Sequence, residues 1–236
     1  MQKIRTIAQW SMDTQRAETD RAVRLEATKI PEEYWGLTWE DYDDVARTND
    51  ESVKDILIDY GAHWDPSERM GVVLLGPPGY GKTFGMLILG VELATHRRAW
   101  VKYTTEERLD EMRKRLIGLD KQAQKDEDWG DYNTAAYQLE FIETECDVLL
   151  LDDVGKAYRA ASGYSDNRLD ALLRRRHEAG KVTCITSNLA HKEWAKIDGS
   201  MASFLYDVGE IVNVSQGKDH RARPAPARAR RRSAGG

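Results

Sequence analysis

The sequence has few of the residues that build disulfide-bonded or zinc-binding modules. It contains only two cysteines in 236 residues, and both Cys146 and Cys184 lie in or beside apolar runs. The cysteines are not at metal-ligand spacing, and the five histidines show no ligand pattern. A disulfide framework and a cysteine-based zinc module are therefore excluded.

Long hydrophobic runs are also missing. No stretch approaches the roughly 20 apolar residues that span a bilayer, and residues 1–10 lack the apolar centre of a signal peptide. Hydrophobic residues still make up 41% of the chain, and charged residues make up 32%. We therefore expect a cytoplasmic, soluble protein with a substantial core, a polar surface and no membrane partner.

Positive charge is concentrated at the C-terminal end. Residues 221–236 hold six arginines and no acidic residue, whereas residues 1–220 hold 29 basic and 40 acidic residues, a net charge of −11. This tail has almost nothing to bury, so we expect it to be disordered. It is a nonspecific hook for nucleic-acid phosphates, a solubilising tail, or a tail that contacts its own acidic body.

The first 45 residues form an extension of the main domain, which we place at residues 46–220. Residues 1–30 predict a helix that ends before Pro31, because a residue preceding proline avoids helical geometry. Residues 31–45 hold four aromatic side chains within nine positions. We expect this segment to pack onto the main domain, with a partner surface as the alternative.

Short apolar runs alternate with helical patterns along the main domain, which predicts an α/β fold with a largely parallel sheet. The expected strands are 71–75, 99–103, 147–151, 182–187 and 211–214. The expected helices are 50–62, 82–95, 105–117, 132–143 and 166–178. The acidic residues 118–131 are expected to form a loop between two of these helices.

A glycine-rich turn follows the first strand. Residues 76–83, GPPGYGKT, fit the phosphate-loop pattern G-x-x-x-x-G-K-[ST], in which glycines let backbone N–H groups face a phosphate. Lys82 is expected to reach the β- and γ-phosphates of ATP, and Thr83 to place its hydroxyl on Mg²⁺. The expected nucleotide-binding residues are Gly76, Pro77, Pro78, Gly79, Tyr80, Gly81, Lys82, Thr83 and Phe84.

Polar residues end two later strands. Residues 148–153, VLLLDD, end in two carboxylates, and residues 183–188, TCITSN, end in an asparagine. Parallel α/β sheets bind ligands at this edge. We expect Asp152 to support Mg²⁺, Asp153 to orient or deprotonate the attacking water, and Asn188 to sense the γ-phosphate, the alternative being ordinary turn or capping roles.

Together these motifs resemble the AAA+ ATPases of the DnaC/DnaI helicase-loader and IstB transposition-helper group. The resemblance covers roughly residues 31–221 and includes the segment before the core, IPEEYWGLTWEDY, and a closing GKDHR. It implies a P-loop fold with five strands ordered 5-1-4-3-2, self-association through the ATP interface, and single-stranded DNA binding. For the loader branch it implies a hexameric, DnaB-type replicative helicase as partner. The group's zinc-bearing module is absent, and so short a loader would suit a phage or plasmid.

Two features depart from that group. Loaders carry an arginine, thought to reach a neighbouring γ-phosphate, where this chain has Phe204. Either Arg168 or Arg176 replaces it, or hydrolysis is slow, since trans-acting arginines contribute roughly 10³–10⁵ in rate. The group's DNA-contacting helix falls within residues 104–145, which carry six basic and twelve acidic residues. Within that segment, only the Arg-Lys-Arg cluster at residues 113–115 offers a site for a DNA phosphate. The alternative is that these three charges lie on an ordinary solvent-exposed helix.

Several functions fit these observations. The first is an ATPase that hydrolyses ATP to ADP and phosphate, slowly, and loads a replicative helicase onto single-stranded DNA. The second is an IstB-like ATPase that assists transposition on duplex DNA, and the third is a nucleotide-binding adaptor with negligible turnover. A small-molecule P-loop kinase fits the paired carboxylates poorly.

Overall fold

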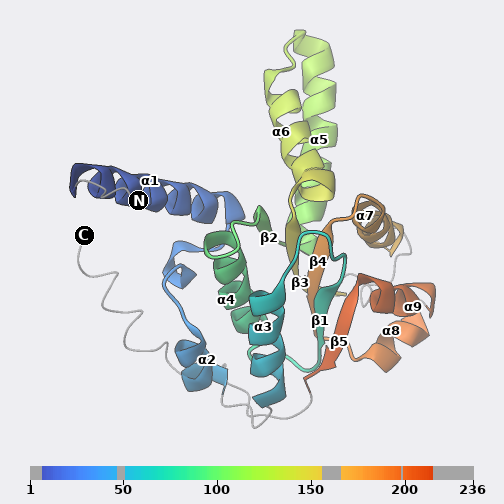
Figure 1. Cartoon of the computed structure of the whole chain (residues 1–236). Coiled ribbons are helices and arrows are strands. Elements are labelled where there is room, and N and C mark those ends of the chain that lie inside the picture. Colours follow the sequence, from blue (N-terminus) through green and yellow to red (C-terminus); the bar gives the residue numbers. More distant parts are fainter. Residues whose placement is uncertain (1–6, 47–50, 156–165, 198, 215–236) are drawn as a thin grey trace.

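The protein is built around a five-stranded parallel sheet (Figure 1). The computed structural model describes residues 7–46, 51–155, 166–197 and 199–214. The strands are β1 (Gly71–Leu75), β2 (Val101–Thr105), β3 (Val148–Val154), β4 (Val182–Ser187) and β5 (Gly209–Asn213). Their order, β2-β3-β4-β1-β5, is the predicted order read from the opposite edge, so the predicted fold is confirmed.

Helices lie on both sides of this sheet. One side carries α1 (Ile7–Thr28), α2 (Trp39–Ala46), α3 (Glu51–His63) and α4 (Lys82–Thr95); the other carries α7 (Asp166–Glu178), α8 (His191–Ile197) and α9 (Gly199–Val208). Successive strand residues point to opposite faces. Val72 and Leu74 of β1 therefore join one buried cluster, while Val73 and Leu75 join the other.

The N-terminal extension packs onto α4. Its helix α1 ends at Thr28, before Pro31, as predicted, and a short 3-10 turn, η1 (Glu32–Tyr34), follows. The side chain of Tyr42 is only 2% exposed, and its ring stacks on Phe84 of α4 with centroids 6.3 Å apart. The predicted packing of the aromatic segment is therefore confirmed.

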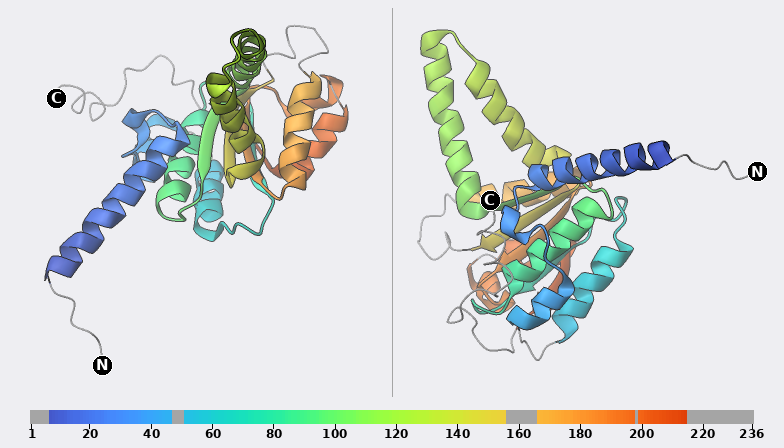
Figure 2. Two further views of the ribbon diagram at one scale, coloured as in Figure 1. Left: turned by 90° about the horizontal axis from the view of Figure 1, so that it is seen from above. Right: turned by 90° about the vertical axis from the view of Figure 1, so that its left-hand side faces the viewer.

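A helical hairpin rises from the body between β2 and β3 (Figures 1 and 2). It consists of α5 (Glu106–Asp126), α6 (Gly130–Glu140) and a π-helical turn, η2 (Phe141–Glu145). The prediction of a loop at 118–131 was wrong for residues 118–126, because α5 continues through them, and for residues 130–131, because α6 begins at Gly130. Gly118 does not end the helix, since a glycine inside a helix costs only about 1 kcal/mol.

The remaining differences concern the ends of strands and two further helices. Strand β2 lies two residues later than expected, and β3 extends to Val154. Helices α8 and α9 were not predicted. Among the described residues, no helix is long and apolar enough to cross a membrane. The arginine-rich tail at 221–236 and the GKDHR segment lie outside the described residues.

Candidate nucleotide-binding site

The phosphate loop joins β1 to α4 through left-handed backbone. Gly76, Gly79 and Gly81 have φ angles of 150°, 91° and 77°, a region that glycine enters without steric penalty. Gly81 is the N-cap residue of α4 and provides no side-chain cap. The first N–H groups of α4, at the positive end of the helix dipole, are therefore available to a phosphate group.

Lys82 is buried at the centre of this loop, with 5% of its surface exposed. Its Nζ donates to the carbonyls of Gly76 and Pro77 at 2.8 and 2.7 Å, and to Oδ1 of Asn188 at 3.0 Å. A buried ammonium needs such acceptors. The phosphates of a nucleotide supply the same kind of oxygen, so the lysine fits the predicted role.

Asp153 and Asn188 meet at the carboxyl edge of the sheet. Asn188 Nδ2 donates to Asp153 Oδ1 at 2.7 Å. Asp153 has a φ of 58°, at an irregularity of β3 against β4 that lies between Leu151 and Val154. A bulge of this kind re-aims a side chain. It turns Asp153 toward Asn188, so that Lys82, Asn188 and Asp153 form one hydrogen-bonded chain.

Asp152 is held on the other side of the loop. Its carboxylate is buried and accepts the Thr83 hydroxyl at 2.8 Å and the Tyr103 hydroxyl at 3.1 Å, together with the hydroxyl of Thr186. A threonine hydroxyl beside a carboxylate is the oxygen donor set that Mg²⁺ takes when phosphates and water complete its shell. Thr83 and Asp152 would hold this ion, which would offset phosphate charge.

Two of these partners were missed by the sequence analysis. Tyr103 lies near the carboxyl end of β2, the strand next to β3, and Thr186 lies in the strand motif from which only Asn188 was chosen. Burial, and then the charge of Asp152, raise the pKa of Tyr103, which keeps its hydroxyl protonated as a donor. Tyr103 could have been found from the sequence as a polar residue near the end of the strand expected beside the one that carries Asp152.

Phe84 uses its side chain for packing. Its ring contacts Tyr34 edge-on at 6.1 Å as well as stacking on Tyr42. The expected nucleotide contact of Phe84 stays a prediction. The phosphate loop and the N-terminal extension are joined through this ring.

The proposed replacements for the missing arginine differ in their positions. The prediction that Arg176 replaces the missing arginine was wrong, because this side chain is fully buried. Its guanidinium donates to Thr183 and Val182 of β4 and to Cys146, which follows η2. Arg168 lies 3.6 Å from Asp110 in an ion pair. Phe204 is 8% exposed.

A different guanidinium covers Phe204. Arg174 of α7 lies over that ring, with its Cζ 4.4 Å from the ring centroid. Its side chain is 42% exposed and is held by Asp170. A guanidinium therefore lies over Phe204, with its charge paired to Asp170.

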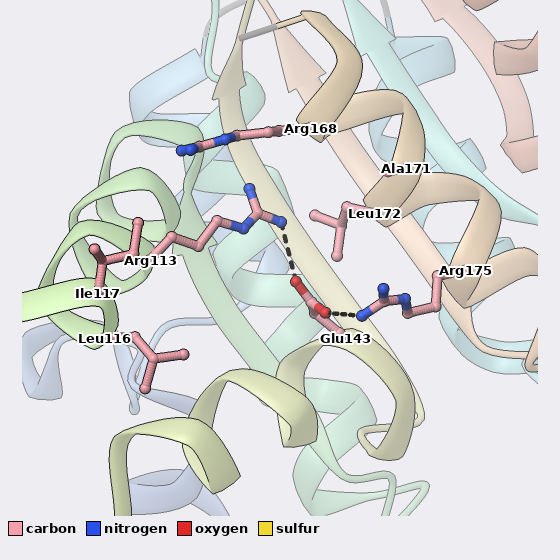
Figure 3. Close-up of a pocket in the computed structure, with 8 residues that line it drawn as sticks. All are labelled: Arg113, Leu116, Ile117, Glu143, Arg168, Ala171, Leu172 and Arg175. Atoms are coloured by element: carbon pink, nitrogen blue, oxygen red, sulfur yellow. Dashed lines mark hydrogen bonds and ion pairs between the residues drawn. The ribbon is translucent and has the colours of Figure 1, made fainter. Parts of the chain in front are cut away.

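The basic cluster at residues 113–115 does not form one site. Consecutive helical residues are turned by about 100°, so Arg113, Lys114 and Arg115 face three different surfaces. Arg113 faces α7, where it pairs with Glu143 at 3.1 Å (Figure 3). Lys114 lines a cleft beside Asp153, and Arg115 lines a separate cavity. The expectation of a single phosphate site there was wrong.

The profile of the family described as IstB-like ATP binding protein matches residues 12–213, which is most of the chain. The chain belongs to that family. The description of the family as ATP-binding agrees with the phosphate-loop motif of this IstB-like protein. A search of curated proteins gave no significant match.

Solved structures resemble this IstB-like protein in fold. DnaI is 20% identical with a TM-score of 0.59, over 82% of this chain and 95% of that chain. The DnaC helicase loader is 17% identical with a TM-score of 0.54, over 70% and 89%. Domain III of the Thermotoga maritima replication initiation protein DnaA is 17% identical with a TM-score of 0.53, over 87% and 73%. These likenesses establish the P-loop AAA+ fold.

Proposed function

We propose that this protein is an ATPase that helps to load a hexameric, DnaB-type replicative helicase onto single-stranded DNA. The observation that carries the proposal is the hydrogen-bonded chain Lys82–Asn188–Asp153, set in a fold shared with DnaI and the DnaC helicase loader. This chain joins the phosphate loop to the ends of β4 and β3. ATP at the loop is thereby linked to two core strands.

The site suggests how ATP acts. The phosphates of ATP compete with Asn188 and the loop carbonyls for Lys82, which already donates to three oxygens. Asn188 is then released to contact the γ-phosphate, and Asp153 to orient water. Because ATP and ADP differ only in the γ-phosphate, they leave Asn188 and Asp153 in different arrangements. A partner that binds one arrangement better responds to the nucleotide.

The test is co-elution of the full chain with the replicative helicase of its source cell, in ATP, in ADP and without nucleotide. We expect a complex that depends on ATP and is lost in Lys82→Ala, which removes the central phosphate contact. Thermal shift in Mg-ATP provides the binding control, since a ligand at 100 times its Kd stabilises a protein by about 2.7 kcal/mol. Wild-type protein that binds ATP but no helicase in any nucleotide state would contradict the loader function.

A second candidate is assistance to transposition on duplex DNA, which is suggested by the family of IstB-like ATP binding proteins. It predicts ATP-dependent assembly on duplex DNA. The net charge of −11 over residues 1–220 opposes a broad duplex footprint. Sedimentation with duplex DNA in ATP and in ADP distinguishes this candidate from the loader.

A third candidate is a nucleotide-binding adaptor with negligible turnover, and the burial of both Phe204 and Arg176 favours it. If copies self-associate through the ATP site, Arg174 is then the guanidinium near position 204 that could serve a neighbour. Phosphate release that disappears in Lys82→Ala would remove this candidate. A further loss in Arg174→Ala would assign the charge to that residue.

A further inference from the structure

A second cavity, of about 650 Å³, lies apart from the phosphate loop, between the end of α1, the edge strand β2 and the base of the α5–α6 hairpin. These elements are far apart in sequence and meet beside β2 (Figure 1). The lining residues are Lys29, Lys102, Tyr103, Thr104, Arg108, Glu111, Met112, Arg115, Gln138 and Ile142. The wall therefore holds four basic side chains and one acidic side chain.

The basic side chains of this cavity lack acidic partners. In the described ranges, no carboxylate forms an ion pair with Lys29, Lys102, Arg108 or Arg115. Lys102 Nζ donates instead to the Ala27 carbonyl at 3.1 Å. Burial, and then the neighbouring charge of Lys29, lower the pKa of Lys102. An anion placed here would offset both effects, because its charge would stabilise the Lys102 ammonium.

The neighbouring pocket on the other side of α5 shows the contrast (Figure 3). It holds three arginines, which share two carboxylates of this chain. Arg113 and Arg175 pair with Glu143, and Arg168 pairs with Asp110. Three cations and two carboxylates leave a formal charge of +1 there, whereas four cations and one carboxylate give the lining of the second cavity a formal charge of +3. The second cavity therefore offers more uncompensated positive charge to a ligand.

The size and walls of the second cavity narrow the class of ligand. A volume of about 650 Å³ is within the range of small-molecule sites and far too small for a double helix. Met112 and Ile142 add apolar surface, and Gln138 and Thr104 add hydrogen-bonding groups. The apolar surface can pack against a nucleobase, and the amide and hydroxyl groups can hydrogen-bond to the edge of that base. The four cations can bind phosphate.

We propose that this cavity binds a free phosphate-bearing ligand of nucleotide size. It is distinct from the phosphate loop but connected to it, because Tyr103 lines the cavity and donates its hydroxyl to Asp152. The proposal goes beyond the loader function. Its test contains no helicase, so either proposal can fail without the other.

The test measures binding to the full chain at several salt concentrations. The free-nucleotide probe is a fluorescent ADP derivative, used in a Lys82→Ala background that removes the phosphate-loop site. The strand probe is a labelled short oligothymidylate. The test variant is Arg108→Ala with Arg115→Ala, two exposed residues whose removal breaks no ion pair in the described ranges. The matched control is Lys121→Ala, an exposed cation of α5 that does not line the cavity.

We expect the double variant to weaken binding of the ADP derivative about tenfold, while Lys121→Ala changes the affinity for both probes by less than about twofold. The affinity of the double variant for oligothymidylate should stay within about twofold of the starting protein. An equal or larger loss for oligothymidylate, with a slope of log affinity against log salt lower by about 1.4 for two lost phosphate contacts, would assign these side chains to a strand and overturn the proposal. Affinities that are unchanged, or that fall equally in the control, overturn the proposal. Circular dichroism confirms that the variants fold.

Discussion

At the scale of single residues, the site depends on a few side chains that each contact more than one element. Lys82 links the phosphate loop to Asn188, and Asn188 links onward to Asp153. Asp153 holds a left-handed backbone, which costs a residue other than glycine about 1–3 kcal/mol and persists only where the surroundings impose it. Its backbone N–H, bound to Thr186 Oγ1 at 2.9 Å, is part of those surroundings.

We predict that Asp153→Asn retains ATP and loses turnover. Asparagine tolerates the left-handed backbone and can still hydrogen-bond to Asn188, but it cannot accept a proton from water. Phosphate release should fall by roughly 10²–10⁴-fold, with ATP affinity within a few-fold of wild type. Glu107→Gln is the matched control, because it makes the same chemical change on the same cleft. Turnover near the wild-type rate in Asp153→Asn would move the catalytic base elsewhere.

The site was predictable where its chemistry is local in sequence. The phosphate loop, the paired carboxylates and the strand-end asparagine each lie within a short segment, and the structure brings them together. Tyr103 was missed because its role depends on the pairing of β2 with β3. Arg176 was misread because charge alone does not reveal that a helix buries a guanidinium against carbonyl groups.

At the scale of elements, the helices that support the site differ in how tightly they pack. Gly90 of α4 has no room for a side chain, since a β-carbon there would lie 2.3 Å from Leu150 Cδ1 of β3. Gly118 of α5 has open space around it. The sequence alone does not tell which of these two helical glycines is tightly packed and which is exposed. For the same reason it did not show that the helix continues past Gly118, so α5 was predicted too short.

We predict opposite effects of the same substitution at these glycines. Gly90→Ala should lower the free energy of unfolding by about 1–3 kcal/mol, because a buried leucine must move in a packed core. Gly118→Ala should raise it by about 0.5–1 kcal/mol through helix propensity alone. Urea titrations of the two variants give both values. Equal effects at the two positions would contradict the close packing of α4 on β3.

At the scale of the whole molecule, the core contains ionisable groups that must stay protonated. Burial raises the pKa of the Cys184 thiol in β4 to about 11, above the usual value of about 8.5. Burial also raises the pKa of Tyr60 in α3. A raised folded-state pKa contributes stability that is complete below the pKa of the unfolded group and is lost as the pH rises through the folded value.

We therefore predict that the protein loses stability between about pH 8.5 and pH 11, by roughly 3 kcal/mol from Cys184. Thermal melts across this range should show a falling midpoint in the wild type. Cys184→Ala removes the titrating thiol, so its midpoint should fall less steeply, although Tyr60 keeps some dependence. Parallel curves for the two proteins would show that the thiol does not contribute.

The phosphate loop is also fastened to the end of the described chain. The Val214 carbonyl oxygen occupies the place of a β-carbon at Gly76, only 2.0 Å from where that atom would lie. The Val214 N–H donates to Leu75 at 2.7 Å. The consequence is mechanical, because a force on the chain beyond Val214 acts on the first turn of the predicted ATP-binding loop. Because Val214 also bonds to Leu75 of β1, tension on that segment would act on the phosphate loop and on the β1–β5 edge of the sheet together.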